Sequence, residues 1–78
     1  MSNLEMYKEI FKKVFSISDE MIESLTYQGI EQWDSVGHME LISEIEDTFG
    51  IMIDTDDIID FSSFEKGKEI LSKYGVQF

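Results

Sequence analysis

Apolar residues recur at three- and four-residue steps in three separate stretches of the chain, which is the spacing of amphipathic α-helices. These stretches are residues 3–15, 35–49 and 64–75. No proline interrupts any of them, and the one strand-like run, residues 51–53, is too short and isolated to build a sheet. The spacing therefore predicts an all-α protein.

The residues at the ends of these stretches predict where the helices start and stop. Asn3 is expected to be the N-cap of the first helix. Gly50 and Gly75 each follow a helix and precede an apolar residue, which is the pattern of a glycine C-cap. Ser62, three residues before Glu65, predicts a capping box at the start of the last helix.

Two less regular segments connect these helices. Residues 54–60 predict a short helical turn around Ile58 and Ile59. Residues 16–33 are expected to form a long connection that folds back over the core, with room for one short helical turn. The predicted fold is a single domain of residues 1–78, a small four-helix bundle with three longer helices and one short third helix.

The composition excludes several kinds of chemistry. The 78 residues include no cysteine and a single histidine, so disulfides, thiolate metal sites and cysteine nucleophiles are excluded. That histidine, His38, lies on the core side of its helix and is expected to be partly buried and hydrogen-bonded rather than a ligand or a catalytic base. The chain starts with neither a basic segment nor an apolar run, and no apolar run approaches the roughly 20 residues of a membrane span. A cytoplasmic protein is therefore expected.

Acidic residues dominate the charge of the chain. Seventeen Asp and Glu against six Lys and Arg give a formal net charge of −11, and no Lys or Arg lies between residues 14 and 65. A polyanion repels nucleic acids and anionic lipids, so basic protein surfaces are the expected partners. A monomer is expected.

Part of the acidic segment has the ligand spacing of a calcium-binding loop, through Asp54, Asp56, Asp60, Ser62 and Glu65. Two isoleucines contradict that interpretation. Ile58 stands at a ligand position, and Ile59 stands where the sharp turn requires glycine. We therefore expect no specific metal site, only diffuse association of divalent ions.

On a helical wheel, residues 35–49 separate into an apolar face and an acidic face. The apolar face is expected to point to the core and contains Leu41, Ile42, Ile45 and Phe49. The opposite side contains Val36, Glu40, Glu44 and Asp47, with Glu46 beside them. No lysine in this segment offsets the repulsion between the acids, which favours a docking surface for basic partners over a merely solvated face.

Ser35 follows Asp34 where the connection becomes a helix. Either residue could simply be the N-cap. A serine hydroxyl at this position is also exposed, and the free backbone N–H groups and the helix dipole would favour a phosphate esterified to it. A serine-protease-like role is disfavoured, because the chain has no GxSxG elbow and its one histidine lies on the core face.

The start of this helix reads Trp33-Asp34-Ser35-Val36-Gly37-His38-Met39-Glu40-Leu41, with Ile45-Glu46 and Phe49-Gly50-Ile51 after it. This stretch resembles the attachment motif and the recognition helix of the acyl carrier protein family. The resemblance runs from about Ile30 to the end of the chain and more loosely through the first helix. Val36 replaces the usual leucine, and Gly37-His38-Met39 looks more like stand-alone carriers of specialised pathways than a housekeeping fatty-acid carrier.

The resemblance implies a carrier that is not an enzyme. Ser35 would receive 4′-phosphopantetheine from coenzyme A through a phosphopantetheinyl transferase, and Asp34 would assist the transferase and its Mg²⁺. Acyl or aminoacyl groups would travel as thioesters on this arm in fatty-acid, polyketide or another specialised biosynthesis, with the core sheltering part of the chain. Acyl-activating and acyl-transfer enzymes with basic patches would dock on Val36, Glu40, Glu44, Glu46 and Asp47. The alternative is an acidic protein-interaction module without a prosthetic group, and a third reading is a calcium-responsive protein.

Overall fold

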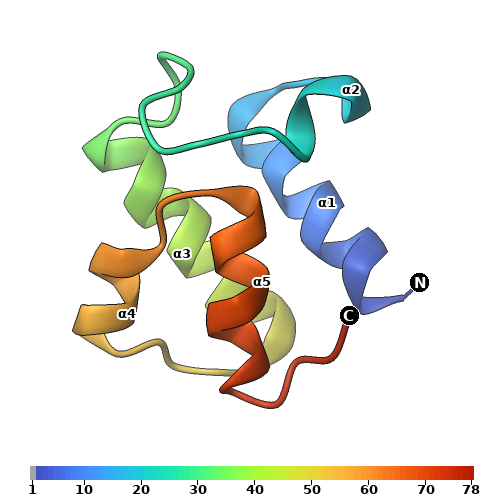
Figure 1. Cartoon of the computed structure of the whole chain (residues 1–78), viewed down its shortest axis with the longest axis vertical. Helices are drawn as coiled ribbons and strands as arrows, with labels where there is room; N and C mark the ends of the chain where they lie inside the picture. Colours follow the sequence, from blue (N-terminus) through green and yellow to red (C-terminus); the bar gives the residue numbers. More distant parts are fainter. Residues whose placement is uncertain (1) are drawn as a thin grey trace.

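The computed structural model describes residues 2–78, and these residues form a bundle of α-helices (Figure 1). The helices are α1 Asn3–Phe15, α2 Asp19–Ile22, α3 Ser35–Phe49, α4 Thr55–Asp60 and α5 Phe64–Ser72. The predicted all-α bundle with three longer helices and a short one before the last is confirmed. The single turn α2 adds a fifth helix, in the connection that had room for it. Within residues 2–78, no helix has both the length and the apolar character needed to cross a membrane.

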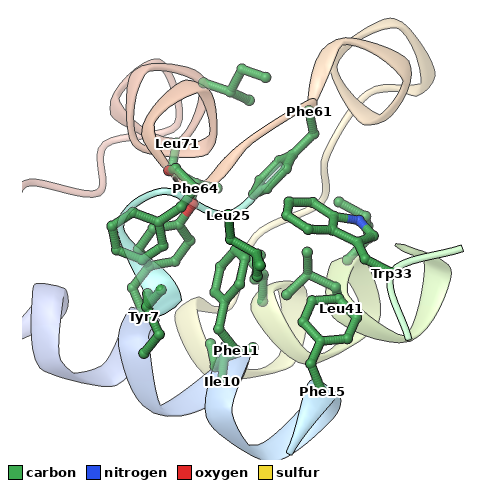
Figure 2. Packing of buried hydrophobic residues seen from close by; sticks show 14 of the residues in the cluster. Tyr7, Ile10, Phe11, Phe15, Leu25, Trp33, Leu41, Phe61, Phe64 and Leu71 are labelled. Atoms are coloured by element: carbon green, nitrogen blue, oxygen red, sulfur yellow. Dashed lines mark hydrogen bonds between the residues drawn. The ribbon is translucent and has the colours of Figure 1, made fainter. Parts of the chain in front are cut away.

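Aromatic side chains form the centre of one hydrophobic core (Figure 2). Phe11 on α1 meets the edges of Trp33 and Phe64, with ring centroids 5.6 Å and 5.2 Å apart. Such edge-to-face contacts add to the stabilisation from burial alone. From α3, the apolar face supplies Leu41, Ile42 and Ile45, which are buried, and Phe49, which is half-buried.

The first N-cap prediction was wrong by one residue. The cap of α1 is Ser2, whose Oγ accepts the N–H of Glu5 at 3.1 Å. The Glu5 carboxylate accepts the N–H of Ser2 in return at 3.3 Å, which completes a capping box. Asn3 lies inside the helix instead, because its side-chain amide donates to the carbonyl of Gln77 near the other end of the chain.

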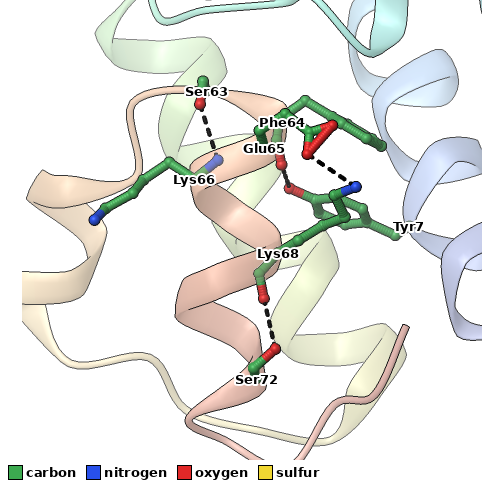
Figure 3. Close-up of polar contacts among 7 residues, drawn as sticks. All are labelled: Tyr7, Ser63, Phe64, Glu65, Lys66, Lys68 and Ser72. Atoms are coloured by element: carbon green, nitrogen blue, oxygen red, sulfur yellow. Dashed lines mark hydrogen bonds and ion pairs between the residues drawn. The ribbon is translucent and has the colours of Figure 1, made fainter.

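The predicted N-cap of α5 was also wrong by one residue. Ser63, not Ser62, is the N-cap, and its Oγ accepts the N–H of Lys66 at 2.9 Å (Figure 3). Ser62 is held outside the helix because its carbonyl accepts the N–H of Tyr27 at 2.8 Å. At the same helix start, the buried hydroxyl of Tyr7 donates to the carbonyl of Phe64 at 2.8 Å.

The predicted C-cap at Gly50 is confirmed, whereas the prediction of Gly75 as the C-cap of α5 was wrong, because the cap is Lys73. Gly50 adopts a left-handed conformation with φ 65°, and the N–H of Ile51 donates to the carbonyl of Glu46 at 3.1 Å. Gly75 has φ 88° and precedes Val76, which is buried. Helix α5 ends at Ser72 rather than at residue 75, so the last residues before this glycine form a turn.

Helix α4 is fastened to the end of α5 by one carboxylate. Asp57 accepts hydrogen bonds from Lys73 Nζ at 2.6 Å and from the Tyr74 hydroxyl at 2.5 Å. The Tyr74 hydroxyl also accepts the N–H of Asp54 at 3.0 Å. These bonds, with that from Lys73 the strongest, lower the pKa of Asp57 below its ordinary value of 3.8.

This lowered pKa gives the stability of the fold an acid dependence. The contribution of Asp57 is present above pH 3.8, where the unfolded carboxyl is ionised, and is lost as the pH falls through the lower pKa of the folded state. We expect Asp57→Asn to be less stable than wild type at neutral pH and the difference to shrink on acidification. Urea unfolding across this pH range measures it, with Asp56→Asn as a control that removes the same charge from an exposed position of α4. A difference in the free energy of unfolding between Asp57→Asn and wild type that does not change with pH would contradict the role assigned to the Asp57 carboxylate.

Candidate functional site

Ser35 is the first residue of α3, and the residue before it caps the helix. Asp34 has an extended backbone, and its Oδ1 accepts the N–H of Gly37 at 2.8 Å. Of the two candidate caps, the structure therefore uses Asp34. This leaves the Ser35 side chain free of a capping role and exposed at the N-terminus of a 15-residue helix.

The hydroxyl of Tyr27 lies 3.3 Å from Ser35 Oγ, and the two share a hydrogen bond. Tyr27 is held there by a short antiparallel pairing between the long connection and the segment before α5. Its N–H donates to the Ser62 carbonyl, and the N–H of Phe64 donates to the carbonyl of Leu25 at 3.0 Å. Sequence patterns could not predict this neighbour of Ser35, because the paired segments are far apart along the chain.

The first turn of α3 lies directly against the connection that precedes it. A Cβ atom at Gly37 would stand 2.0 Å from the carbonyl oxygen of Gln32 and 3.2 Å from the ring of Phe15. The Gln32 amide in turn donates to the Phe15 carbonyl at the end of α1, at 3.3 Å. The Gln32 backbone therefore lies against the first turn of α3, while its side chain is hydrogen-bonded to the end of α1.

His38 joins three parts of the fold. Its Nδ1 accepts the indole N–H of Trp33 at 2.9 Å, so the neutral ring carries its proton on Nε2. Nε2 donates to the carbonyl of Ile58 on α4 at 2.8 Å. The prediction of a partly buried, hydrogen-bonded histidine is confirmed. We call this chain of hydrogen bonds the Trp33–His38–Ile58 bridge.

Two hollows flank Ser35 and share its side chain and that of Met39. The groove between α3 and α4 has a volume of about 390 Å³ and is lined by Tyr27, Ser35, His38, Met39, Ile58, Ile59, Phe61 and Ser62. The broader hollow between α1 and α3 has a volume of about 750 Å³ and is lined by Lys13, Val14, Ser35, Val36, Met39, Glu40, Ser43 and Glu44. Three apolar side chains around Ser35 are more than half exposed, namely Val36, Met39 and Ile59.

A model of the protein family of the phosphopantetheine attachment site matches residues 8–66, well over half of the chain. The chain belongs to this family. The matched segment runs from α1 into α5 and contains Ser35 and both hollows. Members of this carrier family hold 4′-phosphopantetheine covalently and are not enzymes, which confirms the predicted cofactor and class of protein. No protein with a curated description and no solved structure matched the chain.

The residues of this carrier around α3 fit such a group. Ser35 offers an exposed hydroxyl, and the helix start offers backbone N–H groups and a partial positive charge for a phosphate. The backbone carbonyls before the helix already have neighbours, because that of Gln32 lies against Gly37 in the first turn of α3 and that of Trp33 accepts the N–H of Gln28. The Ser35 side chain is exposed, and its Oγ shares a hydrogen bond only with the Tyr27 hydroxyl among the contacts described above.

The predicted docking acids of this carrier have different surroundings. Glu40 and Asp47 are exposed on α3. Glu44 pairs with Lys13 of α1 at 3.2 Å. Glu46 is only partly exposed and accepts the N–H of Ile53 at 2.9 Å, so it braces the turn after α3. A helical wheel cannot show either of these tertiary contacts.

The acidic residues with calcium-loop spacing do not surround a common point in this carrier. Residues 55–60 are helical, and Asp57 is engaged by Lys73 and Tyr74. Across residues 2–78, no three His, Asp or Glu side chains are grouped so that they could hold a metal ion.

Proposed function

We propose that this protein carries acyl or aminoacyl intermediates on a 4′-phosphopantetheine arm attached to Ser35 Oγ. The observation that carries the proposal is the division of roles at the start of α3. Asp34 caps the helix, and the adjacent serine hydroxyl is left exposed within the segment that matches the family. When bound, the arm supplies the thiol for thioester formation, and the chain itself contains no cysteine.

The neighbouring residues have separate roles in this proposal. Tyr27 holds the Ser35 hydroxyl by a hydrogen bond before modification. Asp34 commits one carboxylate oxygen to the Gly37 N–H, and because the residue is exposed its negative charge is accessible to a transferase and its Mg²⁺. A phosphopantetheinyl transferase is accordingly the first partner, and acyl-activating or acyl-transfer enzymes follow.

Incubation with coenzyme A, Mg²⁺ and a broad-specificity phosphopantetheinyl transferase tests the attachment. Intact mass should show one phosphopantetheine adduct per chain, and peptide fragmentation should place it on Ser35. An adduct on another residue would overturn the assignment of Ser35. No adduct with several transferases would favour the acidic interaction module without a prosthetic group.

The exposed part of α3 next to Ser35 is the proposed docking surface. Val36 and Met39 offer apolar contacts, 68% and 53% exposed respectively, and Glu40 lies beside them. Asp47 extends the acidic surface toward the end of the helix. Contacts between exposed charges are weak and screened by salt, which suits a carrier that must leave each enzyme again.

Reversing the charges of this surface should slow docking without unfolding the protein. We expect the double variant Glu40→Lys, Asp47→Lys to be modified about tenfold more slowly by a transferase at low salt, because opposite charges accelerate encounter. The control is Glu23→Lys, Glu69→Lys, which makes the same change of net charge at exposed positions outside α3. Equal slowing of both double variants would assign the effect to net charge rather than to α3.

The proposal also includes the cellular setting that the sequence predicts, a cytoplasmic monomer acting in fatty-acid, polyketide or another specialised biosynthesis. The net charge of −11 supports the monomer, because copies of the chain repel one another.

A further inference from the structure

The side chain of Trp33 fills the end of the bundle that lies nearest Ser35. Its exposure is 0%. The indole stacks on Phe15, with ring centroids 5.3 Å apart, and meets the ring of Phe61 at 6.5 Å. Figure 2 shows these rings between α1, α3 and the segment that joins α4 to α5. Protein interiors are packed as densely as organic crystals, so a guest molecule here would have to displace a side chain.

The Trp33–His38–Ile58 bridge holds that indole in place and joins α3 to α4. The indole N–H and the Ile58 carbonyl both depend on the His38 ring for the hydrogen bonds described above. Breaking the bridge would leave the N–H of a fully buried indole without its partner, which is costly. His38 also lines the groove beside Ser35, so it stands between the groove and the core.

We propose that the Trp33–His38–Ile58 bridge closes the core of this carrier to acyl groups, which lie instead in the surface groove between α3 and α4. A long acyl chain entering from the groove would have to pass His38, break both hydrogen bonds and displace Trp33. This inference rests on attachment of the arm to Ser35. The proposal replaces the expectation from the sequence that the core shelters part of the acyl chain.

The lining of the groove matches a small apolar cargo. Its apolar lining residues are Met39, Ile58, Ile59 and Phe61, and none of its lining residues is Asp, Glu, Lys or Arg. Ile59 at the groove is 73% exposed, so an acyl group can remove apolar surface from water there. Because Ser35 itself lines the groove, an arm on Ser35 Oγ begins at this surface.

Acyl groups of increasing length test the proposal. The protein is loaded from butanoyl-, octanoyl- and dodecanoyl-coenzyme A by a broad-specificity transferase, and intact mass confirms each product. Failure to load would count against attachment at Ser35 and would be seen before any test of the bridge. The structural probes are the NMR signals of the Ile59 methyl group and of the Trp33 indole N–H, which belongs to the sole tryptophan of the chain.

We expect the Ile59 signal to shift between the free-thiol form and the butanoyl form, while the Trp33 signal stays the same for every chain length. Attack of an added thiol on the thioester should vary by less than about twofold across the series, because no form encloses its cargo. A Trp33 shift that grows with chain length, together with protection of the dodecanoyl thioester by about tenfold, would overturn the proposal.

Two variants test the bridge itself. His38→Ala removes it, and we expect the dodecanoyl form of this variant, but not its butanoyl form, to shift Trp33 and to unfold at a higher temperature than its free-thiol form. His38→Gln, whose amide can both accept and donate, should behave like wild type. If His38→Ala does not fold, Trp33→Phe breaks the bridge at the indole N–H, and its acyl forms are compared by unfolding temperature. A folded variant without the bridge that shows no dependence on chain length would overturn the role assigned to it.

Discussion

Ser35→Ala should abolish modification by a phosphopantetheinyl transferase and leave the fold nearly unchanged. The substitution removes the oxygen that would carry the arm. Structurally it removes only an exposed hydroxyl whose hydrogen bond to Tyr27 measures 3.3 Å, so the free energy of unfolding should fall by at most about 1 kcal/mol. Intact mass measures the modification, and urea unfolding measures the stability.

Matched controls separate the serine from its surroundings. Ser62→Ala and Ser43→Ala remove hydroxyls from the two hollows that flank Ser35, and both variants should still be modified. Asp34→Asn keeps a side chain that caps helices equally well but removes its charge. Slower modification of a stably folded Asp34→Asn would assign the effect to that charge. Modification of Ser35→Ala to the wild-type extent would show that the arm is attached elsewhere.

The helices of this fold could be predicted because their signals are local. Apolar spacing identified α1, α3 and α5, and Gly50 marked the end of α3 through a backbone conformation that favours glycine. The predicted N-cap of α1 was one residue too late and that of α5 one residue too early, because contacts with residues distant in sequence determine which residue caps each helix. Asn3 is drawn to Gln77, and the Ser62 backbone pairs with Tyr27.

The candidate site was predictable to the same extent. Asp34 and Ser35 could be selected as candidate site residues because the sequence places them at the start of a helix. The partners of His38 were not visible, because Trp33 and Ile58 are brought to its two ring nitrogens by the loop and by α4. Likewise, Glu46 has the spacing of a docking residue, yet its carboxylate is used by the Ile53 N–H. Spacing along one helix identifies a face but not the neighbouring elements that occupy it.

Gly37→Ala should destabilise the protein by about 3 kcal/mol, the upper part of the usual range for an overpacked position. Alanine favours a helix over glycine by about 1 kcal/mol, so at an open position the substitution would stabilise α3. Here the new methyl group would lie 2.0 Å from the Gln32 carbonyl oxygen. That neighbour is backbone, held through the Gln32 side chain to Phe15, and cannot simply rotate away.

The strain should also reach the attachment site, because relieving it moves the segment from Gln32 to Ser35. We therefore expect Gly37→Ala to be modified more slowly than wild type even under conditions where it is folded. The control is Gly67→Ala, which places a methyl group 2.1 Å from the Tyr7 hydroxyl oxygen and 2.3 Å from the Phe61 ring, away from the backbone before Ser35. It should lose stability as well, but its folded form should be modified at the wild-type rate. Wild-type stability in Gly37→Ala would mean that the connection can withdraw from α3, and the close contact that positions Ser35 would then not be a fixed feature of the fold.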